Sequence, residues 1–259
     1  MELAVALSIS TLLTLILVFA NERGGLLAAD AFPNGRVKGL AYAWVWLLVT
    51  VLTVLVVQSS AASGDIDLTR LSFWSLFVLH VLLLVFLAGW WLMTGRPRID
   101  RFLNLFPADP GRSALIGIAV GVGGWLLTIA TMIGIGLLAQ AAGLLEGLEP
   151  SPVIPWMAGL PLWKRALIVL SAMTVEEAFF RGWLQKRVGL VVSTILFAIS
   201  HAGYGQPFML IGVTIISLVI GWTFYRTKNL WPCIIAHGVF DAIQLFVIVP
   251  VAVQMGGMS

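Results

Sequence analysis

Charged residues are scarce in this 259-residue chain, where they make up 10% of the sequence while hydrophobic residues make up 60%. A soluble domain would carry roughly 25% charged residues, so the composition excludes an ordinary water-soluble protein. The single cysteine, Cys233, excludes a disulfide within the chain. The net charge is only +3 and long basic runs are absent, so the sequence predicts no nucleic-acid partner.

Long apolar runs recur along the chain, and most are near the ~20 residues that a helix needs to cross a bilayer core. These runs predict eight spans, at about 3–20, 40–57, 73–93, 113–140, 164–187, 188–201, 208–226 and 233–253. The fold class is therefore expected to be all-α, a polytopic membrane protein with about eight transmembrane helices. Because there is no internal repeat and no low-complexity tract, we expect a single membrane domain over residues 1–259.

Lysine and arginine are concentrated in the first, third, fifth and seventh connections between these spans. Cytoplasmic loops of membrane proteins carry an excess of these residues. The distribution therefore predicts cytoplasmic odd-numbered connections and both termini outside. In the fourth span, Gly117 and Gly121 form a GxxxG pattern, which permits close packing between helices.

A few ionisable residues fall within the apolar spans, where an unpaired charge costs several kcal/mol. The motif EEAFFR holds three of them, Glu176, Glu177 and Arg181. Glu177 and Arg181 are spaced i, i+4, so they share one helix face and can pair. Glu176 is rotated by about 100° from Glu177 in an α-helix and faces a different neighbour. We interpret Glu177 and Arg181 as a structural pair and Glu176 as a reactive carboxylate. The alternative is a purely structural polar cluster that includes both glutamates.

Two further patterns follow on later helices. In FAISH, Phe197 and His201 share a face, although a lone histidine at a helix end is more often interfacial than catalytic. In HGVFD, His237 and Asp241 share a face, and the carboxylate could orient the ring, set its tautomer or join it as a metal ligand. Three such patterns in one third of the chain predict that the helices converge on a polar, water-filled cavity open to the cytoplasm.

The ordered set EExxxR, FxxxH and Hxxx(N/D) resembles the CPBP family of intramembrane proteases (CAAX proteases and bacteriocin-processing enzymes, also called the Abi family). It is similar to the type-II CAAX prenyl proteases, both in the motifs and in an eight-span layout. The resemblance covers a catalytic core over residues 164–253. It implies an integral, multi-pass membrane endopeptidase that hydrolyses a peptide bond of a membrane-associated protein or peptide.

The family's roles transfer to matching positions of this chain. Glu176 would be the general base that activates water, and His201 would help to hold and polarise that water. His237 and Asp241 would lie where the oxyanion develops. Glu177 and Arg181 would have a supporting role and stabilise the arrangement of the helices around the site. A carboxylate in such a low-dielectric pocket can work as a base near neutral pH.

Asp241 departs from the prenyl proteases, which have asparagine at this position, although bacterial members carry aspartate. An ionised aspartate would repel an oxyanion, so Asp241 could instead be protonated, orient His237 or bind a metal. No metal is favoured as a cofactor, because no HExxH motif is present. If zinc were bound, its ligands would be Glu176, His201, His237 and Asp241.

Two other functions remain open at this stage. A non-catalytic membrane scaffold or immunity factor could keep the same fold and use the polar cluster to hold its helices together. A proton-coupled transporter would also place glutamate, histidine and arginine within the membrane, but no repeat relates the two halves of the chain. The expected setting is a bacterial plasma membrane, with the lipid bilayer and a membrane-associated substrate as partners and the active site facing the cytoplasm.

Overall fold

The structure is a computed structural model, and every regular element that it describes is a helix. The described residues are 2–27, 30–61, 72–106, 109–144, 153–202 and 207–256. Their contacts divide the chain into two compact units, Met1–Phe102 and Leu103–Ser259. The all-α prediction is thus confirmed, and all three polar motifs lie in the second unit.

The first unit is built from three long helices. They are α1 (Glu2–Gly24), α2 (Gly35–Ala61) and α3 (Val78–Met93), with the short 3₁₀ helix η2 (Phe73–Phe77) before α3 and α4 (Ile99–Leu103) after it. Helix α2 packs against both α1 and α3. The Asn21 side chain connects the end of α1 to α2 and to the segment that follows α1. Its amide nitrogen donates to Tyr42 Oη at 2.6 Å, and its amide oxygen accepts from Leu27 N at 2.7 Å.

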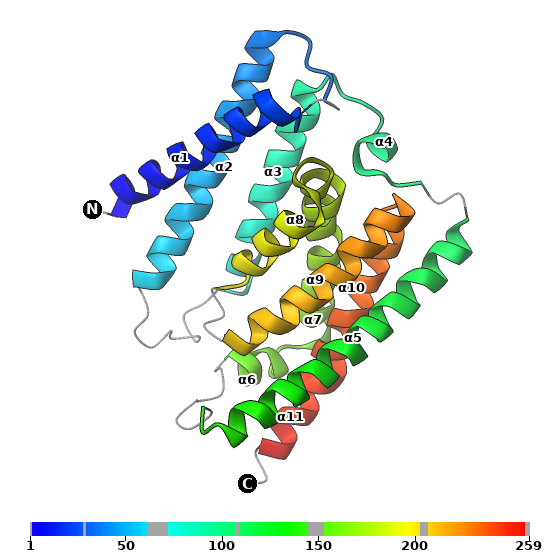
Figure 1. Ribbon diagram of the computed structural model, residues 1–259. Coiled ribbons are helices and arrows are strands. Elements are labelled where there is room, and N and C mark those ends of the chain that lie inside the picture. Colours follow the sequence, from blue (N-terminus) through cyan, green and yellow to red (C-terminus); the bar gives the residue numbers. More distant parts are fainter. Residues whose placement is uncertain are drawn as a thin grey trace. The chain divides into compact units, whose positions relative to one another are not determined.

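The second unit contains the remaining elements (Figure 1). They are α5 (Pro110–Ala141), α6 (Val153–Ala158), α7 (Leu162–Ser171), η3 (Ala172–Glu176), η4 (Ala178–Gln185), α8 (Lys186–Ser200), α9 (Pro207–Thr227), α10 (Trp231–Ile243), η6 (Gln244–Ile248) and α11 (Val249–Gly256). Helix α10 packs against α5, α9 and η3, and α9 also packs against α5 and α8. The segments that carry the motifs therefore share neighbours.

Seven helical stretches among the described residues are long and apolar enough to cross a membrane. Large apolar side chains such as Leu115, Leu126 and Leu138 on α5 are exposed, as expected where a surface faces lipid. The difference from the eight predicted spans arises at the fifth and sixth, which form one stretch, Leu162–Ser200, of 39 residues. A straight helix of that length would extend about 58 Å, about twice the ~30 Å of a bilayer core.

The long stretch reverses direction at Gly189, whose φ of 79° and ψ of 176° interrupt the helical geometry. A positive φ of this size favours glycine. Helix α8 then runs back along η4, because Ser193 Oγ donates to Phe180 O at 2.9 Å and the Phe180 and Phe197 rings meet at 4.9 Å. The fifth and sixth predicted spans are thus two antiparallel arms, which accounts for the count of about eight.

Glycines on α5 allow α10 to approach closely. A Cβ on Gly117 would lie 2.6 Å from Ile235 Cβ, and one on Gly121 would lie 2.7 Å from Ala236 O. Real Cβ atoms do not occupy such positions, so only glycine permits this approach. The GxxxG pattern therefore acts as a packing site, as predicted. The contact fixes the backbone of α10 immediately before His237.

We expect Gly121→Ala to destabilise the protein by about 1–3 kcal/mol, the usual cost of forcing a methyl group into a packed interface. The clash is with the backbone carbonyl of Ala236, which cannot rotate away. Gly123→Ala on the same helix is the matched control, since nothing lies within 4 Å of its added Cβ. Thermal denaturation in detergent measures both variants. Equal melting temperatures for the two would contradict the packing role.

The start of α10 is held by contacts within the second unit. Leu230 N donates to Asn104 O at 2.8 Å, and Trp231 N donates to Asn229 Oδ1 at 3.1 Å. Pro232 lies in the first turn, where its missing N–H costs no helical hydrogen bond. These features place His237 and Asp241 on a helix whose beginning is fixed.

Candidate active site

The first motif lies on an unusual helix. Both η3 and η4 are π-helical, with i→i+5 hydrogen bonds, a geometry that is rare and often found at functional sites. Every residue from Val175 to Gln185 is buried. This segment therefore carries Glu176, Glu177 and Arg181 into the interior of the second unit.

Glu177 is the centre of a buried ionic network. Its Oε1 atom lies 3.0 Å from Arg181 Nη1 and 2.8 Å from His237 Nδ1. Glu177 is 0% exposed and Arg181 is 1% exposed. The i, i+4 pair expected from the sequence is present, and it also links the first motif to the third.

Arg181 has further partners on two other helices. Its Nη2 atom lies 3.0 Å from Ser217 Oγ and 3.2 Å from Ser217 O, both on α9. The guanidinium also lies 4.6 Å from the centroid of the Phe197 ring on α8, within range of a cation–π interaction. One arginine thus connects η4, α8 and α9. Sequence reasoning missed Ser217, for which a small polar residue in an apolar span was the only signal.

Glu176 faces a different helix. Its Oε2 atom lies 3.8 Å from His201 Nε2, and the Glu176 side chain is 10% exposed. On the other side of the imidazole, His201 Nδ1 lies 2.8 Å from Phe197 O. Because a carbonyl oxygen can only accept, Nδ1 is the ring nitrogen that carries the proton. In neutral His201, Nε2 therefore presents its lone pair toward Glu176.

The ring of His237 lies between two carboxylates. Its Nδ1 atom lies 2.8 Å from Glu177 Oε1, and its Nε2 atom lies 3.4 Å from Asp241 Oδ2. The His237 side chain is 8% exposed and the Asp241 side chain is 23% exposed. Of the three possible roles for Asp241, this geometry favours orientation of the His237 ring.

The structure brings all six residues of the sequence-predicted site into one connected region. Glu176 contacts His201, whereas the ring nitrogens of His237 face Glu177 and Asp241. The glutamate that contacts His237 is therefore Glu177 and not Glu176. The two adjacent glutamates at the junction of η3 and η4 face different helices, because Glu176 contacts His201 at the end of α8 and Glu177 contacts His237 on α10.

The proposed zinc ligands do not form a ligand set in this arrangement. Among the described residues, no group of three or more histidine, cysteine, aspartate or glutamate side chains is placed to hold a metal ion. Both ring nitrogens of His237 are already directed at carboxylates. A zinc ion would require His237 to give up one of these contacts.

Two cavities lie elsewhere in the second unit, with volumes of about 520 and 470 Å³. Neither has Glu176, His201, His237 or Asp241 among its lining residues. The cytoplasm-facing cavity around the motifs therefore stays a prediction.

The fold and site define the class: a multi-pass helical membrane protein with a buried cluster of glutamate, arginine and histidine. Residues 158–243, which carry all three motifs, match the family described as type II CAAX prenyl endopeptidase Rce1-like. The resemblance found in the motifs is confirmed over this segment. No solved structure matches the chain.

The chain is also similar to a curated protein from Bacillus subtilis (strain 168), the uncharacterized protein YpbD. The two are 39% identical over 77 residues. The match covers 29% of this chain and 41% of the length of YpbD. The similarity is thus confined to part of each chain.

Proposed function

We propose that the protein is an intramembrane endopeptidase in which Glu176 activates water to hydrolyse a peptide bond of a membrane-associated protein or peptide. The observation that carries this proposal is the pairing of Glu176 with His201 inside the segment that matches the endopeptidase family. The separation of 3.8 Å exceeds a direct hydrogen bond, and one water held by both groups suits such a distance.

In the proposed reaction, the water oxygen attacks the carbonyl carbon of the scissile peptide bond while a water proton passes to Glu176. His201 Nε2 accepts a hydrogen bond from the same water and orients it. The developing oxyanion needs a donor. His237 Nε2 suits this role when the ring is an imidazolium, because Nδ1 already donates its proton to Glu177 at 2.8 Å and only a second proton lets Nε2 donate. The contact of Nε2 with Asp241 is longer, at 3.4 Å. The weaker contact, between Nε2 and Asp241, can be exchanged for a hydrogen bond to the oxyanion.

The tetrahedral intermediate then collapses. Glu176 returns its proton to the leaving amide nitrogen, the C–N bond breaks, and the new carboxyl group retains the oxygen that came from water. Glu177 holds His237 as a donor throughout, and Arg181 balances the charge of Glu177. Asp241 is a positioning residue for the ring. The proposal needs no metal ion, and the site would face the cytoplasm with both termini outside.

The test compares the termini of membrane proteins by mass spectrometry in cells that carry the wild type or Glu176→Gln. We expect a set of new C-termini and their complementary fragments in the wild type only. Glu22→Gln is the matched control, because its side chain is 62% exposed on α1, in the first unit. Identical sets of termini in wild type and Glu176→Gln, with both proteins present at equal levels, would favour the scaffold function.

A further inference from the structure

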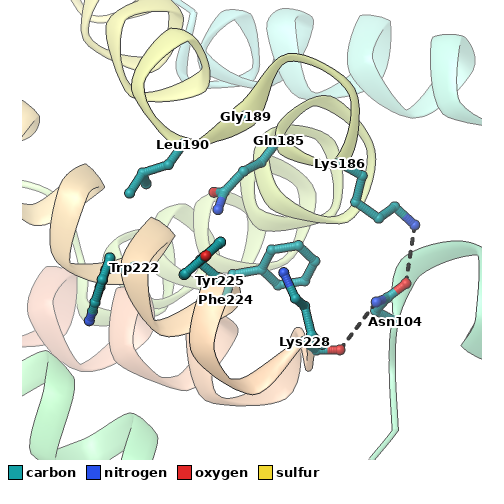
Figure 2. Close-up of a pocket in the computed structure, with 9 residues that line it drawn as sticks. All are labelled: Asn104, Gln185, Lys186, Gly189, Leu190, Trp222, Phe224, Tyr225 and Lys228. Atoms are coloured by element: carbon teal, nitrogen blue, oxygen red, sulfur yellow. Dashed lines mark hydrogen bonds between the residues drawn. The ribbon is translucent and has the colours of Figure 1, made fainter. Parts of the chain in front are cut away.

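The cavity of about 520 Å³ lies among the junction of η4 with α8, the last turns of α9 and the segment after α4 (Figure 2). It is separate from the proposed catalytic residues, none of which lines it. The described residues that line the cavity include two lysines and no aspartate or glutamate. The cavity therefore favours an anionic ligand.

The two lysines are tied together by one asparagine. Lys186 Nζ donates to Asn104 Oδ1 at 3.2 Å, and Asn104 Nδ2 donates to Lys228 O at 3.1 Å (Figure 2). Both lysines are exposed, and Lys228 Nζ lies 4.5 Å from the centroid of the Tyr225 ring. Asn104 thus connects Lys186, at the start of α8, with Lys228, the residue after α9, at one cavity.

The wall of the cavity also offers an unmatched acceptor. Gln185 is buried at 7% exposure, and its Nε2 donates to Gly221 O at 2.7 Å. Within the described part of the chain, Gln185 Oε1 has no hydrogen-bond partner. A buried acceptor without a partner costs free energy. A ligand that brings an N–H or O–H donor would recover it.

The cavity lies beside an aromatic pair that is typical of a membrane interface. Trp222 and Tyr225, on the last turns of α9, are both more than half exposed and their rings stack at 5.4 Å. Tryptophan and tyrosine concentrate at the level of lipid headgroups. Basic pockets between membrane helices at this level bind anionic headgroups.

We propose that this cavity binds the headgroup of an anionic phospholipid that carries hydroxyl groups, of the phosphatidylglycerol type. The phosphate lies between Lys186 and Lys228, and a headgroup hydroxyl donates to Gln185 Oε1. The ligand chemistry is a phosphodiester with an adjacent hydroxyl, and the aromatic pair assigns its source to the bilayer rather than to solution. The site does not depend on the proteolytic function.

Native mass spectrometry of the full chain in detergent tests the proposal with three added lipids. Phosphatidylglycerol supplies the charge and the hydroxyls, phosphatidylmethanol supplies the same charge without hydroxyls, and phosphatidylcholine is zwitterionic. We expect phosphatidylglycerol to bind about fivefold more tightly than phosphatidylmethanol, as one hydrogen bond would provide. Phosphatidylcholine should bind most weakly. Equal affinity for phosphatidylglycerol and phosphatidylcholine would overturn the site.

Substitutions of the two lysines test whether phosphatidylglycerol binds in this cavity. Lys186→Gln and Lys228→Gln should each weaken phosphatidylglycerol binding about fivefold, and together about 25-fold. Lys164→Gln is the matched control, since Lys164 lies over Trp163 at the start of α7 and does not line the cavity. Because both cavity lysines are exposed, thermal denaturation should show that their variants remain folded. Equal affinity in the control and in the cavity variants would overturn the assignment.

Two further experiments test the role of the headgroup hydroxyl and the source of the ligand. In Gln185→Met, the preference for phosphatidylglycerol over phosphatidylmethanol should disappear, while the preference for either over phosphatidylcholine remains. Retention of the first preference would overturn the role of Gln185. Soluble glycerol phosphate at millimolar concentration should not displace bound phosphatidylglycerol. Displacement at that concentration would assign the cavity to a free phosphate ester and overturn the lipid source.

Discussion

Replacement of Glu176 by glutamine is expected to lower the rate of peptide-bond cleavage by about 10²- to 10⁴-fold, the usual contribution of a general base. Glutamine keeps the size of the side chain but cannot accept a proton from water. The Glu176–His201 separation of 3.8 Å is longer than a hydrogen bond, so little stability depends on this contact and we expect the variant to fold. The measurement is a single-turnover rate in nanodiscs with a substrate identified from the new termini.

Two comparisons make this result specific. Glu22→Gln carries the same chemical change at an exposed site and should retain the wild-type rate. His201→Leu should also slow the reaction, because it removes the lone pair that Nε2 presents toward Glu176 and supplies no other acceptor. A folded Glu176→Gln protein that cleaves at the wild-type rate would exclude Glu176 as the base.

Replacement of Arg181 by methionine is expected to destabilise the protein by about 3–5 kcal/mol, the cost of leaving one member of a buried ion pair without its partner. Arg181 is 1% exposed and Glu177 is 0% exposed, so water cannot replace the lost guanidinium. The contacts with Ser217 and Phe197 disappear as well. Thermal denaturation in detergent measures the change.

The double variant Glu177→Leu and Arg181→Met should be less destabilised than the sum of the two single variants, because it leaves no unpaired charge between them. Arg98→Met is the control for an exposed pair. Arg98 lies 2.7 Å from Asp100 and its side chain is 74% exposed; its hydrogen bond to that carboxylate lowers the pKa of Asp100. Because solvent screens such an exposed pair, its loss should leave the melting temperature close to that of the wild type. Strict additivity of the buried single variants would contradict the pairing.

Local patterns in the sequence predicted the parts of this structure that depend on neighbouring residues. The i, i+4 spacing predicted the contact between Glu177 and Arg181, because both lie on one helix. The Gly117–Gly121 pattern predicted close packing but not its partner, since α10 lies more than 100 residues further along the chain. Apolar run lengths predicted the spans, and Gly189 explains why two of them form one stretch.

Contacts between helices that are distant in the chain could not be predicted from the sequence. Glu177 and His237 are 60 residues apart, and their pairing depends on how η3 and α10 pack. The sequence argument assumed an α-helix, whereas Glu176 ends the π-helix η3 and Glu177 separates it from the π-helix η4. The contact of Arg181 with Ser217 likewise depends on the approach of α9. Motif spacing therefore predicted the site residues, and the packing of the helices determines which of them are in contact.

The central claim, that Glu176 directs water onto a peptide bond, is tested most directly by comparing new C-termini formed in water enriched in ¹⁸O. Hydrolysis places one solvent oxygen in every carboxyl group that it creates. Membranes with the wild-type protein should yield C-termini that carry a single ¹⁸O atom, and membranes with Glu176→Gln should yield none at the same positions. Labelled termini of equal abundance in both samples would contradict the account.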